Sequence, residues 1–186
     1  MGSGFKSPRS SRRIVIICFA VIAALTLLMS VLYFTKDPNQ FVVVGNSMEP
    51  TLSDGDNIEI SQASSLKQDD IAVFARQEQW TETPRDDEHD LIIKRIAALP
   101  GDTLDFRDDA LYVNNKLEYK LPESYECALD DDWSVTVPGG SIFVMGDNAP
   151  DSRDSLFASC HENSDPFVHI SDLHAFGSVT LKTRLI

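Results

Sequence analysis

Basic residues are scarce in this chain beyond residue 13. Its 186 residues include 16 lysines and arginines against 29 aspartates and glutamates, and the formal net charge is −13. Residues 1–13 contain four basic residues and no acidic one, so the remainder of the chain carries −17. This balance argues against nucleic-acid binding, which depends on clustered Lys and Arg. The acidic runs DDEHD and DDDW lack the ligand spacing of a cation site and are interpreted as solvated loops.

Charged residues are absent from the next segment, residues 14–34. A helix of this length spans about 30 Å, the thickness of the hydrocarbon layer of a membrane. A buried core helix would be shorter and would show a polar face, and a cleavable signal peptide would end in a small-x-small site. The segment is therefore predicted to be a transmembrane anchor, with residues 1–13 in the cytoplasm and residues 35–186 outside.

Helical periodicity is nearly absent after the anchor. Short apolar or alternating runs, bounded by turn residues, predict strands instead. These runs are 41–44, 57–61, 70–76, 91–99, 103–106, 110–115, 141–145 and 175–186. A polar loop is expected at 79–90, and the segment 118–134 has no clear period. The predicted fold is mostly β, with one N-terminal transmembrane helix and an exported β-rich domain.

Cysteines are few. Cys18 lies in the apolar segment and is interpreted as a small apolar side chain. Cys127 and Cys160 lie in the exported part, where a disulfide can persist. Sequence separation does not determine their distance in space, so a disulfide and two free buried thiols are both open.

No histidine lies near Ser47 in the sequence, although Ser47 directly follows a strand-like run and begins the turn-rich stretch SMEPTLSDGD. A serine hydroxyl attacks poorly unless a base removes its proton. The four histidines, His89, His161, His169 and His174, occur in polar stretches that do not suggest a Ser-His-Asp arrangement.

Lys94 is a second candidate for a base. It lies within the apolar run LIIKRIAAL, where strand alternation places it on one face with Ile92 and Ile96. A lysine at a strand edge would keep its ammonium in water. A buried lysine would have its pKa lowered by as much as about 3–5 units, which makes it a competent general base near neutral pH. The residue pattern alone leaves both alternatives open.

Three motifs occur in order along the chain: SMEPTL (47–52), KRIAALPGD (94–102), and GDN (146–148) followed by SRDS (152–155). Together with the single N-terminal apolar segment, they resemble the three catalytic boxes of bacterial type I signal peptidases, also called leader peptidases. The resemblance covers the anchor and the chain from about residue 41 to residue 155.

The resemblance implies a role for each matching residue. Ser47 corresponds to the nucleophile and Lys94 to its general base, while Ser152 corresponds to the serine that orients the lysine. Arg95 and Asp147 correspond to a charged pair that braces the site. The oxyanion would be held mainly by the backbone N–H of Ser47. No cofactor and no metal ion is expected.

The resemblance also implies the substrate, the location and the domain plan. The substrates would be signal peptides of exported preproteins with small residues at positions −1 and −3, bound in shallow apolar pockets near Met48, Leu52, Ile92 and Ile93. The enzyme would lie in the bacterial cytoplasmic membrane, with the lipid bilayer as a partner. The catalytic core would carry a smaller β cap, inserted at about 103–139.

The third motif departs from the family pattern at two positions. Ala149 and Leu156 stand where arginines are common, so Asp154 cannot form the family's salt bridge to the second of them. Either Arg153 replaces that arginine or Asp154 is solvated.

Two other readings of the motifs remain. One is a Ser-Lys protease dedicated to other substrates, such as pilus or surface proteins; a self-cleaving repressor is disfavoured because it would need a DNA-binding region. The other is a membrane-tethered binding module with an inactive site.

Overall fold

The computed structural model describes residues 8–34, 39–75, 91–123, 125–162 and 164–182. The chain divides into two compact units, Met1–Pro38 and Asn39–Ile186. The loop predicted at 79–90, which contains His89, lies outside the described residues.

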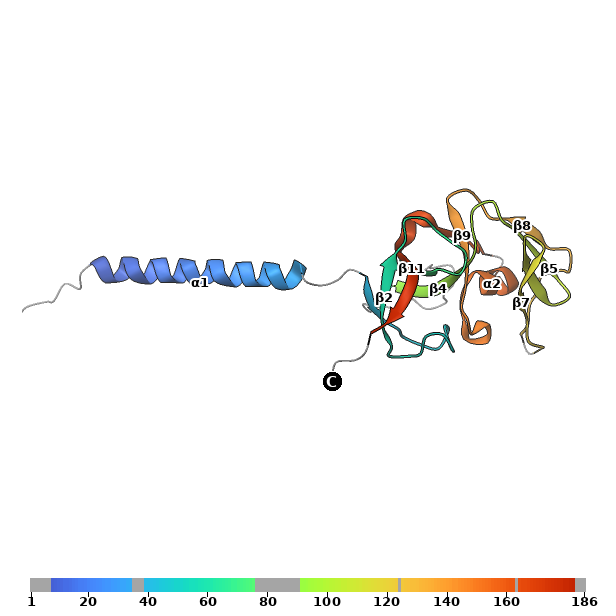
Figure 1. Ribbon diagram of the computed structural model, residues 1–186, viewed down its shortest axis with the longest axis horizontal. Helices are drawn as coiled ribbons and strands as arrows, with labels where there is room; N and C mark the ends of the chain where they lie inside the picture. The colour runs from blue at the N-terminus through green and yellow to red at the C-terminus, as the bar shows by residue number, and fades with distance from the viewer. Residues whose placement is uncertain (1–7, 35–38, 76–90, 124, 163, 183–186) are drawn as a thin grey trace, which may run out of the picture. The chain divides into compact units, whose positions relative to one another are not determined.

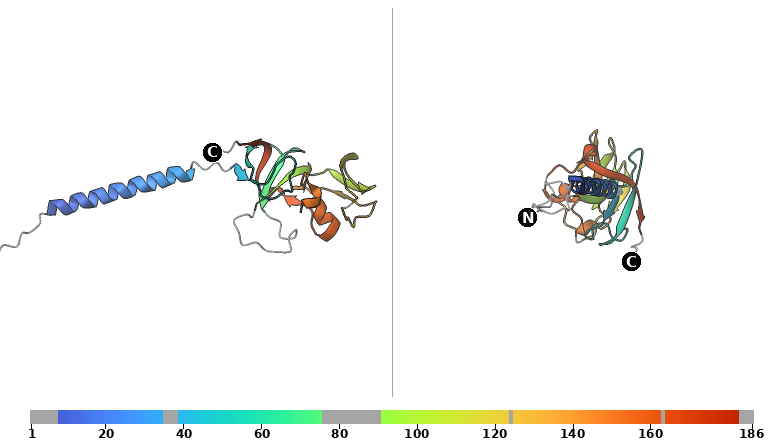
Figure 2. Two further views of the ribbon diagram at one scale, coloured as in Figure 1. Left: turned by 90° about the horizontal axis from the view of Figure 1, so that it is seen from below. Right: turned by 90° about the vertical axis from the view of Figure 1, so that its left-hand side faces the viewer.

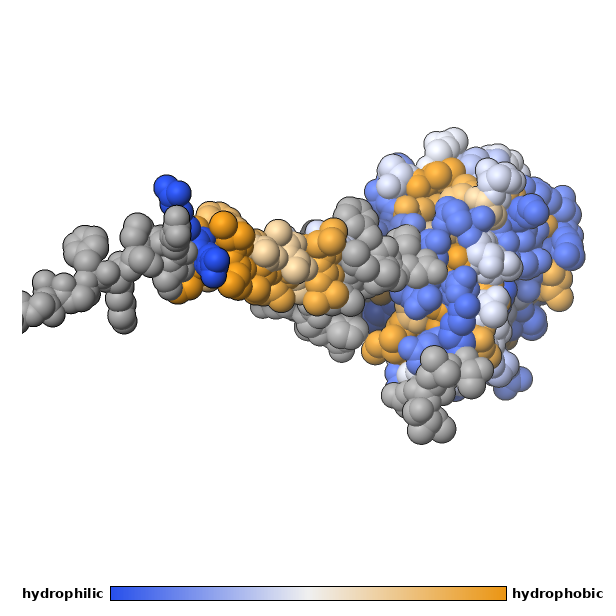
Figure 3. Space-filling view, turned by 60° about the vertical axis from the view of Figure 1, so that its left-hand side comes forward, coloured by the Kyte–Doolittle hydropathy of each residue, from blue (hydrophilic) through white to orange (hydrophobic). Residues whose placement is uncertain are grey.

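The N-terminal unit contains one long helix, α1 (Pro8–Phe34). Its residues Arg12–Ser30 have a mean hydropathy of 2.5 and are long and apolar enough to cross a membrane. Large apolar side chains from Ile14 to Met29 are exposed around the helix, and they form the apolar surface that follows the blue N-terminal end in Figure 3. The hydroxyls of Thr26 and Ser30 donate to backbone carbonyls of the preceding turn.

The second unit is built on a seven-stranded antiparallel sheet with the order β1-β2-β11-β3-β4-β9-β10 (Figure 1). Its strands are β1 (Gln40–Val42), β2 (Asn57–Gln62), β3 (Ile71–Ala75), β4 (Leu91–Ala98), β9 (Ser141–Met145), β10 (Val168–His169) and β11 (Leu173–Leu181). Each strand predicted in this part is present, and the mostly β fold is confirmed.

A four-stranded antiparallel sheet, of order β7-β6-β5-β8, occupies the interval between β4 and β9. Its strands are β5 (Thr103–Arg107), β6 (Ala110–Val113), β7 (Lys116–Lys120) and β8 (Ser134–Thr136). Asp108 and Asp109 both have φ of 53°, which is the backbone of a tight hairpin turn between β5 and β6. This sheet falls within the segment where the cap was predicted.

Between the two sheets lie α2 (Ser155–Phe157) and the π-helical turn η3 (Ala158–Glu162), as both Figure 1 and the left view of Figure 2 show. One apolar cluster joins all three parts, with Leu104 and Leu111 from the small sheet, Phe143 from the large sheet, and Leu156 and Cys160 from the helical segment. The helical segment therefore packs against both sheets.

Candidate active site

Ser47 lies in a turn that follows β1. Gly45 enters this turn with φ of +87°, a conformation that favours glycine, and its N–H donates to Asp54 Oδ1 at 2.8 Å. After Ser47 the chain folds back, so that the N–H of Leu52 donates to the carbonyl of Met48 at 2.9 Å. The side chains of Met48 and Leu52 are buried in a core cluster. Two apolar anchors therefore fix the turn that presents Ser47.

Lys94 lies in β4, a central strand of the large sheet, and its side chain is only 4% exposed. Its Nζ lies 2.6 Å from Ser47 Oγ. Burial lowers the pKa of Lys94 from 10.5 to about 8, and attraction to Asp154 and Asp147 opposes part of that shift. The alternative of a strand-edge lysine that keeps its ammonium in water is therefore excluded. With this pKa, about half of the lysine side chains are uncharged at pH 8, and each has a lone pair available for a proton.

Arg95 and Asp147 lie together beside Lys94. Arg95 Nε donates to Asp147 Oδ1 at 2.8 Å and Nη2 donates to Oδ2 at 2.6 Å, a bidentate pair. Arg95 Nη1 also donates to the carbonyl of Asp69 at 2.8 Å. Burial alone would raise the pKa of Asp147, but hydrogen bonds from Arg95 and Thr51 outweigh it and hold this pKa below its ordinary value. Asp147 is thus a stable anion within electrostatic range of Lys94.

The third motif packs directly on the backbone of the nucleophile. The Asn148 N–H donates to the Ser47 carbonyl at 3.0 Å. A Cβ placed on Gly146 would lie 2.4 Å from that carbonyl oxygen and 2.3 Å from Ser152 Oγ. Ser152 is buried, and within the described residues its hydroxyl has no hydrogen-bond partner of normal geometry. It lies near enough to Asp154 to help lower that carboxyl's pKa, and its role in orienting Lys94 stays a prediction.

Asp154 corrects one expectation, because it is 1% exposed and therefore not solvated. Its Oδ2 accepts the N–H of Gly146 at 2.8 Å, and Oδ1 accepts those of Leu156 and Phe157 at 3.0 and 3.1 Å. Burial raises the pKa of Asp154, and these hydrogen bonds oppose the rise. The aspartate therefore caps α2, a role that an Asp directly before a short helix could have suggested from the sequence.

The two positions that lack the family arginines are both buried. Ala149 is enclosed, and Leu156 is fully buried in the apolar cluster between the sheets. The Arg153 guanidinium lies over the Phe157 ring, 5.0 Å from its centre.

The predicted pocket residues separate into two groups. Ile93 packs against the core cluster that contains Met48 and Leu52, whereas Ile92 packs against a different cluster with Phe74 and Ile96. The assignment of these four residues to substrate pockets stays a prediction.

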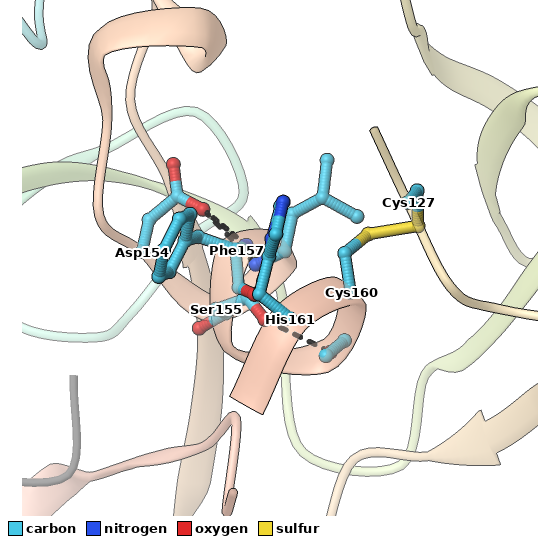
Figure 4. Close-up of a disulfide and its surroundings, with 8 residues drawn as sticks. Cys127, Asp154, Ser155, Phe157, Cys160 and His161 are labelled. Atoms are coloured by element: carbon cyan, nitrogen blue, oxygen red, sulfur yellow. Dashed lines mark hydrogen bonds between the residues drawn. A yellow bond between two sulfur atoms is a disulfide. The ribbon is translucent and has the colours of Figure 1, made fainter. Parts of the chain in front are cut away.

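His161 and His169 each lie close to a polar atom of another residue. His161 Nδ1 lies 3.1 Å from the Phe157 carbonyl, and His169 Nδ1 lies 3.4 Å from Ser141 Oγ. His174 is an exposed residue of β11. The sulfur atoms of Cys127 and Cys160 are bonded to each other, which settles the alternative that the sequence left open (Figure 4).

Comparison with known proteins identifies the class to which this site belongs. Residues 11–179 match the family described as "Signal peptidase, peptidase S26", and the chain belongs to that family. It is therefore a type I signal peptidase, a serine endopeptidase that removes signal peptides. A membrane-anchored enzyme fits both the family and the apolar helix α1.

Individual relatives agree with this assignment. Signal peptidase I P of Bacillus subtilis subsp. natto is 32% identical over 184 residues, which cover 92% of this chain and 94% of that protein. A signal peptidase I of Bacillus amyloliquefaciens is 36% identical over 152 residues, covering 73% of this chain and 74% of the relative. Among solved structures, a signal peptidase I from Enterococcus faecalis V583 has a TM-score of 0.41 and 23% identity, and covers 62% of this chain and 98% of its own.

Proposed function

We propose that this signal peptidase cuts its substrates with a Ser-Lys dyad and an acyl-enzyme intermediate. Uncharged Lys94 takes the proton of Ser47 Oγ as that oxygen attacks the carbonyl carbon of the residue before the cleavage point. The charged lysine then gives the proton to the leaving amine. Lys94, uncharged again, then activates a water molecule, which hydrolyses the ester and releases Ser47. The proposal requires no cofactor and no metal ion.

One observation carries the proposal: Lys94 Nζ lies 2.6 Å from Ser47 Oγ, within a site where the lysine is 4% exposed. The contact distance satisfies the geometric requirement for proton transfer, and burial supplies the pKa that a base needs. Ser152, Arg95 and Asp147 are proposed as supporting residues, because each lies at the site but none is in hydrogen-bond contact with Ser47 Oγ within the described residues.

The proposed substrates are exported preproteins with small residues at positions −1 and −3. An extended segment that pairs with a strand edge presents alternate side chains to the same surface, so two shallow pockets would read these two positions. Pockets near Met48, Leu52, Ile92 and Ile93 are proposed for this role.

The proposed arrangement in the cell places residues 1–13 in the cytoplasm, residues 14–34 in the cytoplasmic membrane and residues 35–186 outside. The four basic residues before the apolar segment support this orientation. Within the outer part, the sheet of β5 to β8 is proposed to be a cap on the catalytic core. Protease added outside intact spheroplasts should then digest the catalytic domain. Digestion only after lysis would contradict this orientation.

Cleavage of a preprotein with an Ala-x-Ala site tests the dyad. Detergent-solubilised wild type, Ser47→Ala and Lys94→Ala are compared, and mass spectrometry locates the cut. Cleavage after the −1 alanine by wild type alone supports the proposal, because each variant removes one member of the dyad. Cleavage that persists in Lys94→Ala would reject the lysine as base. A folded wild type that leaves this substrate intact would instead favour dedicated substrates or an inactive site.

A further inference from the structure

The disulfide joins two segments that the sheets do not pair. Cys127 lies in the excursion between β7 and β8, and Cys160 lies in η3, where it is 2% exposed (Figure 4). A backbone hydrogen bond reinforces the link, because the Ala128 N–H donates to the Cys160 carbonyl at 3.1 Å. The excursion is thus tied to η3 by a covalent bond and by its backbone.

The tied helical segment begins at the active site. The chain runs from Asp154 through α2 directly into η3, and Asp154 caps α2 by accepting the N–H groups of Leu156 and Phe157. Its other carboxylate oxygen accepts the N–H of Gly146 at 2.8 Å, and Gly146 packs on the Ser47 carbonyl. A displacement of α2 and η3 would therefore move the buried carboxylate and the backbone on which Ser47 rests.

The same carboxylate lies within electrostatic range of the base. Asp154 and Asp147 are the anions whose attraction acts on Lys94, and Tyr119 of β7 and Tyr125 of the excursion lie within electrostatic range of Asp154. Burial is the larger influence on Lys94: it lowers the pKa of the lysine, whereas the attraction to the two carboxylates raises it.

Aromatic contacts continue the link from the excursion to α2. The Tyr125 ring packs edge-on against His161 with centres 5.7 Å apart, and His161 stacks on Phe157 at 4.4 Å. Phe157 is also the last residue that Asp154 caps. The excursion, the disulfide and α2 therefore form one packed unit next to the dyad.

We propose that the Cys127–Cys160 disulfide is a positioning element for the Ser47–Lys94 site, acting through α2, Asp154 and Gly146. It holds the buried carboxylate behind Gly146, on which the Ser47 carbonyl packs, and keeps water out of this corner. The inference rests on the proposed Ser47–Lys94 dyad. It predicts that loss of the disulfide impairs catalysis beyond any effect on folding. It also predicts a higher pKa for the base, because burial is the larger influence on Lys94 and its loss outweighs a weaker attraction to Asp154.

The test compares full-length, detergent-solubilised wild type with the double variant Cys127→Ala/Cys160→Ala, using the pH dependence of kcat/KM. The matched control is Cys18→Ser, which removes the third cysteine and leaves the disulfide in place. The double variant should show its rising limb at higher pH, toward the ordinary lysine value. A shift of about one pH unit would lower kcat/KM about tenfold at pH values below the midpoint of the rising limb. Cys18→Ser should follow the wild type.

A second measurement covers the case in which the double variant does not fold. Folded wild type is reduced with a phosphine, its thiols are counted, and circular dichroism confirms that the sheets remain. Activity should fall with the same shift of the limb, and reoxidation should restore both. If either disulfide-free form is folded and keeps the wild-type kcat/KM and limb, even with a lower melting temperature, the disulfide is merely structural and the inference is wrong.

These outcomes separate the inference from the proposed function. If Lys94→Ala still cleaves the substrate, the dyad itself is rejected and the inference falls with it. If Lys94→Ala is inactive and the double variant behaves as wild type, only the positioning role is rejected.

Discussion

Gly146 shows how closely single residues determine this site. It has no side chain where the Ser47 carbonyl and the Ser152 hydroxyl approach, and its N–H is a hydrogen-bond donor to Asp154. Any side chain at this position would meet the backbone of the nucleophile, which cannot move away as a flexible side chain could.

Gly146→Ala is expected to reduce kcat/KM at least tenfold. The added Cβ would lie 2.4 Å from the Ser47 carbonyl oxygen, so the turn that carries the nucleophile must shift. A displacement of about 1 Å in a reacting group can lower the rate by about 100-fold. Gly139→Ala is the matched control, since a Cβ there meets no atom within 4 Å. Equal activity of both variants would contradict the close packing described for Gly146.

Lys94 illustrates a conflict between stability and function. Its pKa in the folded protein is about 8, below the ordinary 10.5, so the unfolded chain binds the proton more tightly. The cost to stability is fully present below pH 8 and disappears as the pH rises toward 10.5. Such a shift corresponds to about 3 kcal/mol at neutral pH.

Lys94→Met should therefore abolish cleavage and raise the free energy of unfolding at pH 7 by about 1–2 kcal/mol, with part of the gain lost because Asp154 loses its cation. Urea unfolding at pH 7 and pH 10 measures this change, and the gain over wild type should shrink at the higher pH. Lys116→Met, at an exposed position of β7, should show no such dependence. A gain that is equal at both pH values would contradict a desolvated lysine.

At the scale of elements, the turn 47–52 matters more than any regular strand, because it carries the nucleophile between two buried anchors. Met48 and Leu52 are each 1% exposed and pack among Val43, Ile58 and Ile71. The turn thus owes its position to the core beneath it.

Leu52→Ala should lower the free energy of unfolding by about 2–5 kcal/mol, the usual cost of a cavity at a buried leucine. It should also lower kcat/KM, because the turn loses one of its two anchors. Chemical denaturation and the cleavage assay measure these effects. Leu117→Ala is the control, since Leu117 is 51% exposed in β7 and its loss should cost less than about 1 kcal/mol. Equal costs at the two positions would contradict the proposed anchoring.

The sequence predicted most strands but not all of them. The runs at 57–61, 71–75 and 141–145 are strands because their apolar side chains are buried on at least one face. The strands β7, β8 and β10 were missed. The residues of β7 are exposed or half-buried and give no alternating pattern, and β8 and β10 have only three and two residues. The strand at 41–44 was placed too far along the chain, because β1 ends at Val42 and Val43 pairs with Asp56 outside the sheet.

At the scale of the whole molecule, the site is assembled from three distant parts of the chain: the turn at 47–52, the strand β4 and the third motif. Motif order identified Ser47 and Lys94 as a candidate pair, although no local pattern links residues so far apart. The hydrogen bond from Gly146 to Asp154, the close packing at Gly146 and the Cys127–Cys160 disulfide depend on tertiary contacts, which the sequence alone does not specify.

The acidic character of the chain is consistent with the proposed function, because no part of the proposed reaction needs a basic surface. The four basic residues of residues 1–13 stand apart from the acidic remainder, on the other side of the apolar segment. In the proposed orientation, these basic residues would lie on the cytoplasmic side of the membrane.

The central claim is that a buried, uncharged lysine activates Ser47, and the pH dependence of kcat/KM for the wild-type enzyme tests it most directly. Cleavage of the Ala-x-Ala preprotein would be measured from pH 6 to 10.5 in detergent. The account predicts a rising limb with its midpoint near pH 8, the pKa of Lys94 in the folded protein. A midpoint near the ordinary histidine value of about 6.5, or near the ordinary lysine value of about 10.4, would contradict it.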